Sequence, residues 1–207
     1  MKKLDFNQAY ILENDVVQLR PLLLSDIEEL INFSINEPTL WDYSLTPANG
    51  RENLTKYITA AIADKEIGKS YPFIVMDKRN NKYAGSTRFY DYNTTHNTTQ
   101  LGYTWYGKDF QGTGLNKNCK YLLLEFAFEK LGLDRVEFRA DNDNERSIAA
   151  MKSLGCKVEG VLRSNCASPT GRRNSIVLSI LKDEWFDSVK ASLKKKCIAE
   201  VERSHKI

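Results

Sequence analysis

Apolar residues near the start of the chain change from a short alternating run to helical spacing. Residues 16–20 form a β-like run that ends at Pro21 and is typical of a first strand. Ser25 and Glu28 have the spacing of a capping box, in which each side chain satisfies a free backbone group at the start of a helix. The helix predicted after this box is expected to bury Ile27, Leu30, Ile31 and Phe33.

A second helix and three strands are predicted next. Residues 51–67 carry apolar side chains at every third or fourth position, which is typical of a helix. Two β-rich runs, residues 71–76 and 83–90, flank a polar, Asn-containing turn and are typical of a hairpin. A further β-rich run covers residues 100–106. Three strands in succession, joined by short polar segments, predict an antiparallel arrangement.

The pattern becomes strongly helical in the second half of the chain. Residues 115–131 form an amphipathic helix, and Gly132 lies just past its end, where glycine commonly follows a helix. Residues 136–140 then predict another strand. The run 100–106, the helix and this strand together predict a parallel strand–helix–strand crossover.

The remaining elements follow in close order. A helix is predicted over residues 144–154 and is stopped by Gly155. Two strands are predicted over residues 157–162 and 175–181, with a loop over residues 164–174 between them. A final, basic helix begins soon after the last strand.

These elements predict a mixed α/β (α+β) fold. We expect a twisted, mostly antiparallel sheet with one parallel strand–helix–strand crossover and flanking helices. No internal repeat or low-complexity linker divides the chain. The sequence therefore predicts one domain over residues 1–190 and a basic helical tail over residues 191–207.

Composition and charge narrow the function classes. The chain has 207 residues, of which 42% are hydrophobic and 28% charged, so it has enough apolar residues for a sizeable core. Thirty Lys and Arg against 27 Asp and Glu leave a net charge of +3, far from a dedicated nucleic-acid-binding domain. Neither an export signal nor a membrane-spanning apolar run is visible. We therefore expect a cytoplasmic protein without nucleic-acid or membrane partners.

Cysteine and histidine usage argues against two kinds of site. The four cysteines show no C-x-x-C spacing, so the sequence indicates neither a disulfide framework nor a thiolate zinc site. The two histidines, His96 and His205, lie in a polar loop and among the last few residues. A Ser–His–Asp hydrolase and a histidine-rich metal centre are therefore not expected, and we predict no metal.

The segment Gln111–Asn116, with the sequence Gln-Gly-Thr-Gly-Leu-Asn, lies between a predicted strand and the long helix. Glycines let the backbone approach a ligand closely, and the free N–H groups at a helix start favour anions. This arrangement predicts a diphosphate site, although a structural turn explains the glycines equally well. It is not a P-loop, and Lys117 stands where a dinucleotide-binding motif has its third glycine.

The order of elements over nearly the whole chain resembles the GNAT superfamily of acyl-CoA N-acyltransferases, in particular the branch of ribosomal-protein N-terminal acetyltransferases. Gln111 and Gly114 match the superfamily motif Q/R-x-x-G-x-G/A, with Asn116 in place of the last small residue. Residues 144–148 and 154–156 are similar to its later N-x-x-S/A-I and L-G-F segments. Two motifs at the expected separation make the resemblance more specific than the glycines alone.

This resemblance implies acetyl-CoA as the cosubstrate. Residues 101–106 and 136–140 would diverge into a V, where the pantetheine arm pairs with free backbone groups like an added strand. Asn144 would hydrogen-bond the pantetheine, and Ser147 would lie near the sulfur. The implied acetyl-CoA-binding residues are Thr104, Trp105, Tyr106, Gln111, Gly112, Thr113, Gly114, Leu115, Asn116, Asn144 and Ser147.

Acetyl transfer in this superfamily is a direct attack of a neutral amine on a thioester, helped by a base for the amine and an acid for the sulfur. The chain departs from the family pattern at both positions. Gln100 stands where several relatives carry glutamate, and Met151 stands where they carry tyrosine. Ser147, four residues before Met151 on the same helical face, is the substitute proton donor that we expect. Asp91 and Asp42 are alternative candidates for the base, and the other interpretation of both is that they are solvated acids in loops.

The missing base favours an acceptor with a low pKa. The pKa of an α-amine is about 7.7–8.0 against about 10.4 for lysine, so its neutral fraction at pH 7 is roughly 300-fold larger. The predicted acceptor is a primary amine, either a protein N-terminus or a small amine, and the enzyme a monomer or homodimer. The side chains expected to form the acceptor wall are Trp41, Tyr43, Arg88 and Tyr90.

Two other functions stay open. Gln100 and Met151 also fit a catalytically weakened or regulatory CoA-binding domain. A dinucleotide-dependent oxidoreductase would need a doubly wound parallel sheet, and the hairpin predicted over residues 71–90 argues against it. The roles of four basic residues stay open. Lys117 and Lys120 would contact phosphates or be solvated, and Arg172 and Arg173 would contact an acidic partner or be solvated.

Overall fold

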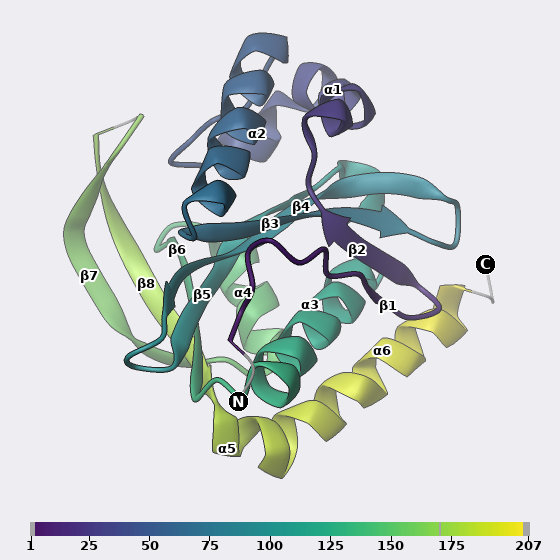
Figure 1. Ribbon diagram of the computed structural model, residues 1–207, viewed down its shortest axis with the longest axis vertical. Helices are drawn as coiled ribbons and strands as arrows, with labels where there is room; N and C mark the ends of the chain where they lie inside the picture. Colours follow the sequence, from purple (N-terminus) through teal and green to yellow (C-terminus); the bar gives the residue numbers. More distant parts are fainter. Residues whose placement is uncertain (1–2, 170, 205–207) are drawn as a thin grey trace.

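The computed structural model describes residues 3–169 and 171–204, which form one twisted eight-stranded sheet with helices on both faces (Figure 1). The strand order is β1-β2-β3-β4-β5-β6-β8-β7. The β5–β6 pair is parallel and the others are antiparallel. The strands are β1 (Leu12–Glu13), β2 (Val17–Pro21), β3 (Ser70–Asp77), β4 (Lys82–Asn93), β5 (Thr98–Tyr106), β6 (Arg135–Asp141), β7 (Lys157–Ser168) and β8 (Gly171–Leu181).

Helices α1 and α2 cover one face of the sheet, and α3, α4 and α6 cover the other (Figure 1). The helices are α1 (Ile27–Asn36), α2 (Arg51–Glu66), α3 (Leu115–Glu125), α4 (Glu145–Leu154), α5 (Lys182–Glu184) and α6 (Lys190–Ser204). Helix α3 continues into a π-helical turn over Phe126–Lys130. None of the helices within the described ranges is long and apolar enough to cross a bilayer.

Two hydrophobic clusters bury the sheet, one on each face. The cluster under α1 and α2 contains Leu30, Ile58 and Trp105, and the cluster under α3 and α6 contains Leu123 and Trp185. Burial on both faces explains why β3 is apolar along nearly its whole length. The predicted mixed fold with its hairpin and parallel crossover is therefore confirmed, and a doubly wound parallel sheet is contradicted.

The two parallel strands separate soon after they begin. Strands β5 and β6 pair only from Thr98 opposite Arg135 to Gln100 opposite Glu137, and then both continue apart. Strand β5 also carries a bulge, because Tyr103 and Thr104 together face the single residue Thr87 of β4. The expected V between these strands is thus confirmed, and it leaves one edge of β5 without a neighbouring strand beyond Gln100.

Two predicted details are wrong. The expected Ser25–Glu28 capping box is absent. A 3-10 turn over Leu24–Asp26 precedes α1, and the Asp26 carboxylate accepts the Leu23 N–H at the start of that turn at 2.8 Å and pairs with Arg20. The loop expected over residues 164–174 is a continuation of the β7–β8 hairpin. Its strand β7 is exposed along most of its length, so polar residues there resemble a loop in the sequence.

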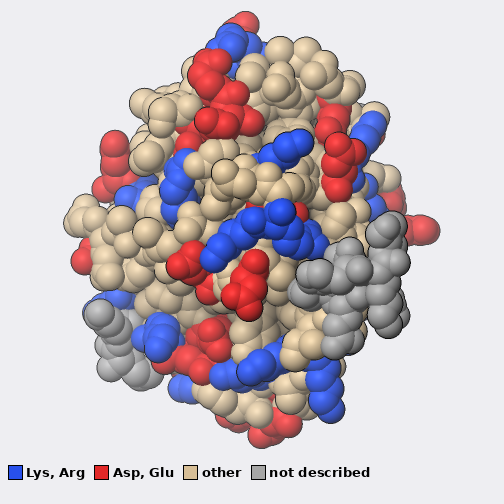
Figure 2. Space-filling view, turned by 90° about the vertical axis from the view of Figure 1, so that its right-hand side faces the viewer, with Lys and Arg blue, Asp and Glu red and all other residues tan. Residues whose placement is uncertain are grey.

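The C-terminal helix packs on the domain. Leu193 and Cys197 of α6 are buried in the same cluster as α3. The predicted division between a domain and a tail at residue 190 remains a prediction, and His205 lies outside the described residues. Figure 2 shows one face of the molecule, on which the coloured Lys and Arg side chains alternate with Asp and Glu. That part of the surface therefore lacks the continuous positive charge typical of nucleic-acid-binding proteins.

Candidate active site

A cavity of about 530 Å³ occupies the V between β5 and β6. Trp41 and Tyr57, from the side of α1 and α2, line one part of it. Lys120 of α3 and Met151 of α4, from the opposite side of the sheet, line another. The cavity lining therefore comes from both faces of the sheet and includes Tyr103 and Thr104 of the β5 bulge.

The glycine segment lies at one end of this cavity and leads into α3. Gly112 and Gly114 adopt φ values of 75° and 83°, which residues with a side chain rarely adopt. Gly114 is the N-cap of α3, so the first free N–H groups of that helix lie beside the segment. A Cβ atom built on Gly112 meets nothing within 4 Å, so this side of the loop is open. The backbone geometry fits a diphosphate.

Side chains from three elements brace the glycine segment. Gln111 donates from Nε2 to the Tyr106 carbonyl at 2.8 Å and accepts a hydrogen bond from Arg146 of α4. Arg79, in the β3–β4 turn, donates to the Thr113 carbonyl at 2.9 Å and pairs with the buried Asp77 at 2.6 Å. The sequence analysis missed Arg79, since nothing in the sequence indicates that the hairpin turn meets this loop.

Most of the implied acetyl-CoA-binding residues line the cavity. Those that do are Thr104, Trp105, Tyr106, Gln111, Gly112, Asn116, Asn144 and Ser147. Gly114 is buried at the helix start, the Thr113 hydroxyl donates to the Phe110 carbonyl, and the Leu115 side chain is fully buried in the core. Asn144 is the N-cap of α4, where its Oδ1 accepts the Ser147 N–H at 3.0 Å.

Lys120 is buried in the cavity wall, with 4% of its surface exposed. Its Nζ donates to the hydroxyls of Thr87 and Thr104, at 3.0 and 2.7 Å, directly beside the bulge of β5. Burial lowers the pKa of Lys120 to about 8. The predicted alternative in which Lys120 is a solvated surface residue is therefore wrong. The sequence did contain one indication that Lys120 is buried. The residue lies three, four and seven positions before apolar residues, all of which are buried: Leu123, Leu124 and Ala127.

The two candidate groups for handling the amine proton lie side by side. Gln100 donates from Nε2 to the Asp91 carboxylate at 3.0 Å, and both residues line the cavity. The Oε1 atom of Gln100 is buried and has no hydrogen-bond partner within the described residues. Asp42, the other acid that we considered, is exposed and is not among the described residues that line the cavity. Met151 is buried at the cavity wall.

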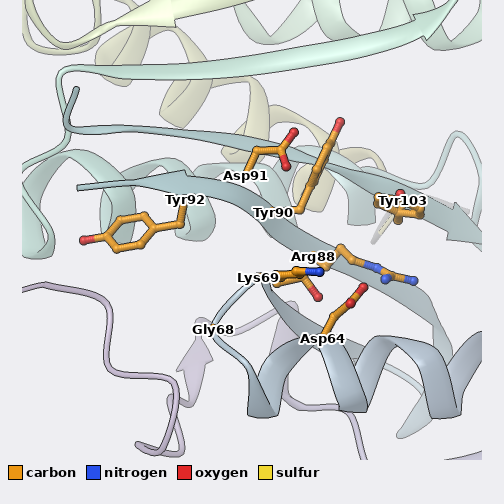
Figure 3. Close-up of a pocket in the computed structure, with 9 residues that line it drawn as sticks. Asp64, Gly68, Lys69, Arg88, Tyr90, Asp91, Tyr92 and Tyr103 are labelled. Carbon is orange, nitrogen blue, oxygen red and sulfur yellow. The ribbon is translucent and has the colours of Figure 1, made fainter. Parts of the chain in front are cut away.

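The four residues predicted for the acceptor wall divide between two neighbouring spaces. Trp41, Tyr43 and Tyr90 line the large cavity. Arg88 instead lines a side pocket of about 370 Å³ between α2 and β4, which shares Tyr90 and two other residues with the large cavity (Figure 3). Burial raises the pKa of Tyr90 well above its ordinary value, so its phenol stays neutral.

The late arginines differ from their prediction as loop residues. Arg173 is 9% exposed, lines the cavity and lies 3.9 Å from the Asp141 carboxylate. Arg172 is exposed, and its Nε donates to the Ser164 hydroxyl within the hairpin. Both belong to β8, because the segment expected as a loop is a strand.

Comparison with known proteins gives relatives with the same fold. The Bacillus subtilis (strain 168) protein named "Putative ribosomal N-acetyltransferase YdaF" is 30% identical over 102 residues, which are 49% of this chain and 55% of that protein. The chain thus spans little more than half the length of that relative. Spermidine N(1)-acetyltransferase from Escherichia coli (strain K12) is 23% identical over 170 residues, covering 82% of this chain and 88% of that protein. A GCN5-related N-acetyltransferase from Brucella melitensis superposes with a TM-score of 0.84 at 22% identity, covering 92% and 86% of the two chains.

A family model described as the acetyltransferase (GNAT) domain matches residues 17–157. The match covers more than half of the chain and includes β5, the glycine segment, α3 and α4, which together build the cavity. An open V and glycines before a helix are the features that the family resemblance implies for an acyl-CoA site. The chain therefore belongs to the GNAT family of acetyltransferases.

Proposed function

We propose that this protein transfers the acetyl group of acetyl-CoA to a primary amine, with the α-amine of a protein N-terminus as the first candidate acceptor. The observation that carries the proposal is the continuous cavity through the V, which joins the glycine segment to the aromatic residues under α1 and α2. A donor and an acceptor entering from opposite sides would meet beside the bulge of β5.

The residues present fit acetyl-CoA. The N–H groups at the start of α3 would hold the diphosphate, and the open side of Gly112 leaves room for it. The unpaired edge of β5 near Thr104 and Trp105 would pair with the pantetheine amides. Asn116 and Asn144 also line the cavity that contains the glycine segment and this edge of β5. When bound, acetyl-CoA supplies the activated acyl group as a thioester.

The transfer forms a C–N bond to the acyl carbon and breaks the C–S bond, so the amine loses one proton and the sulfur gains one. Near the acceptor side, the orphaned Oε1 of Gln100 would accept a hydrogen bond from the amine. The adjoining Asp91 carboxylate would accept the proton that the amine loses and release it to water. Gln100 itself cannot act as a base, as the sequence predicts, so its neighbour Asp91 would be the base.

Two side chains in the cavity lining are candidate proton donors for the leaving sulfur. Lys120 is mostly protonated at pH 7, because its pKa is about 8, close to that of a thiol. Ser147, at the first turn of α4, also lines the cavity, but a hydroxyl is a weaker acid. We propose that Lys120 supplies the proton and that the Ser147 hydroxyl orients the sulfur.

Replacement of Ser147 by alanine is expected to lower kcat by about tenfold and to leave acetyl-CoA affinity within about twofold, because the variant loses one hydrogen bond of about 1–1.5 kcal/mol. Stopped assays of released CoA thiol and calorimetric titration of acetyl-CoA would measure the two quantities. Ser153→Ala, on the same helix but away from the cavity lining, is the matched control. An unchanged kcat in Ser147→Ala would remove this residue from the transfer step.

The acceptor assignment is tested by comparing two amines in one peptide. A peptide with a free N-terminus and one lysine should be acetylated at the α-amine at least 100-fold faster at pH 7, because its neutral fraction is roughly 300-fold larger. Mass spectrometry of the product locates the acetyl group. Faster modification of the lysine would contradict the proposed acceptor. The names of the two relatives point to different amines, ribosomal and polyamine, so spermidine belongs in the same assay.

The alternative, a CoA-binding domain without useful activity, rests on the buried Met151 at the position of the family's tyrosine acid. It predicts tight acetyl-CoA binding with no CoA release on any amine. Lys120 favours the active enzyme, since burying its charge at the cavity wall costs more stability than its two hydrogen bonds return.

A further inference from the structure

The side pocket next to the active-site cavity has a charged lining that the proposed reaction does not use. Its walls come from the end of α2, the segment that leads into β3, and the strands β4 and β5. It shares Tyr90, Asp91 and Tyr103 with the large cavity, so the two spaces meet at these residues. Asp64 projects from α2 toward Arg88 of β4 (Figure 3).

Arg88 is the unusual member of this lining. It is 5% exposed, and its guanidinium lies between the rings of Tyr57 and Tyr103, 4.9 and 4.0 Å from their centroids. Among the residues that the structure describes, the Arg88 side chain has neither an ion pair within 4.0 Å nor a hydrogen bond. Its buried Nε also lacks a partner. Stacking on two rings occupies the faces of the guanidinium and leaves its N–H groups directed outward in the plane.

A buried cation without an anion is costly, and buried arginines are normally paired. Arg88 is therefore set up for an anion that arrives with a ligand. A planar carboxylate fits best, because the guanidinium fork binds it with two parallel hydrogen bonds. The rings of Tyr57 and Tyr103 would hold the fork in place for it.

The rest of the lining fits a ligand with both charges. Asp64 and Asp91 are acidic, and Lys69 and Arg88 are basic, so the pocket is balanced overall. Asp91 lies at the junction with the large cavity, beside Gln100, whereas Arg88 lies in the side pocket. Arg88 pairs with Gly102, next to the bulge of β5, whereas Asp91 follows Tyr90, which pairs with Gln100. An amine at Asp91 and a carboxylate at Arg88 would therefore be the two ends of one ligand across the junction of the two spaces. A volume of about 370 Å³ suits a small molecule or one or two residues of a peptide.

We infer that the acceptor is an amine that also carries a carboxylate, and that Arg88 binds this carboxylate while the amine lies at Asp91 and Gln100. The inference rests on the proposed acetyl transfer and specifies its substrate class. The same chemistry has two sources, a free amino-carboxylic acid and an acidic side chain next to a peptide N-terminus. Arg88 is then the residue that selects acceptors.

Matched acceptor pairs test this inference and separate the two sources. The first pair is a free amino acid and its carboxamide, and the second is a peptide amide with Asp or Asn at its second position. After correction for the neutral fraction of each amine, kcat/KM should be about 10- to 100-fold higher for the carboxylate in at least one pair. Preference in the first pair identifies a small acid as acceptor, and preference in the second identifies a protein N-terminus.

Arg88→Met should remove this preference by lowering kcat/KM for the carboxylate acceptor to the value for its amide, which itself should change little. Arg51→Met, an exposed arginine at the start of α2, is the matched control and should keep the preference. Unchanged stabilisation of Arg88→Met by acetyl-CoA shows that the variant is folded. If Arg88→Met does not fold, Arg88→Lys provides the test. Lysine keeps the charge but lacks the two-pronged guanidinium, so the preference for the carboxylate over the amide acceptor should fall about tenfold.

Equal rates within both pairs in the wild type would overturn the inference, as would a preference that survives in Arg88→Met. Spermidine as the fastest acceptor, with a rate unaffected by Arg88→Met, would also overturn it. The proposed function fails separately. Absence of turnover with every amine contradicts acetyl transfer itself, whereas turnover without a carboxylate preference contradicts the role of Arg88 alone.

Discussion

Gly114→Asp is expected to weaken acetyl-CoA binding by at least 100-fold, while Gly114→Asn weakens it by only a few fold. Gly114 has a φ of 83° at the N-cap of α3. Asp and Asn tolerate this backbone region better than other side chains and are both good N-caps, so the two variants should fold alike. They differ in one negative charge, which would cost about 3 kcal/mol in contact with a bound phosphate at the effective dielectric of such sites.

The measurement is the rise in melting temperature with acetyl-CoA, since a ligand at 100 times its Kd adds about 2.7 kcal/mol of stability. This rise should disappear in Gly114→Asp and persist, slightly reduced, in Gly114→Asn. A short acetyl thioester without a diphosphate provides the internal control, because its turnover should respond equally to the two substitutions. Equal acetyl-CoA affinity of the two variants would show that the diphosphate does not lie at the start of α3.

The comparison of sequence and structure shows which features a pattern can predict. The amphipathic helix α3, the β3–β4 hairpin and the glycine segment follow from residues close together in the chain, and the structure contains all three. The V between β5 and β6 came from a family resemblance, because no local pattern encodes where two parallel strands separate. The polar part of the β7–β8 hairpin was missed since its strand is exposed on both sides and shows no alternation.

Four basic residues of the site were missed by sequence reasoning or lie elsewhere than it expected. Arg79 reaches the glycine segment from the distant β3–β4 turn, and Arg173 is buried because the expected loop is a strand. Lys120 and Arg88 are buried in the walls of the two pockets. A charged residue is exposed in most proteins, and its burial depends on tertiary contacts that one sequence does not reveal. Such exceptions concentrate at functional sites, where stability is given up for chemistry.

Lys120→Met is expected to lower kcat by about 100-fold or more and, in the same protein, to raise stability at pH 7. Methionine fills the space of the lysine chain without a charge. The pKa of Lys120 is about 8 in the folded protein and 10.5 ordinarily, a difference that corresponds to about 3 kcal/mol of burial cost. Loss of the two hydrogen bonds to Thr87 and Thr104 offsets about 2 kcal/mol of this, and the two hydroxyls keep their bond to each other.

The net gain of about 1 kcal/mol corresponds to about 2–4 °C in Tm for a chain of this size. Its pH dependence has a definite sign. The folded protein releases the Lys120 proton near pH 8, whereas the unfolded chain keeps it to about pH 10.5. The cost of burying the charge is therefore fully present below pH 8 and declines as the pH rises toward 10.5. The stability advantage of Lys120→Met should be largest near pH 7 and should shrink between pH 8 and 10.

The pH dependence of kcat separates a proton donor from a structural lysine. If Lys120 protonates the leaving sulfur, the wild-type kcat with saturating substrates falls as the pH rises through about 8, and Lys120→Met lacks this decline. Lys56→Met, an exposed lysine on α2, is the control and should change neither stability nor kcat. A Lys120→Met variant that gains stability and retains its kcat would show that another group protonates the sulfur. Ser147 would then be the first candidate. A variant that loses both stability and activity would instead make Lys120 a structural residue, since its two threonine contacts would then outweigh the cost of its buried charge.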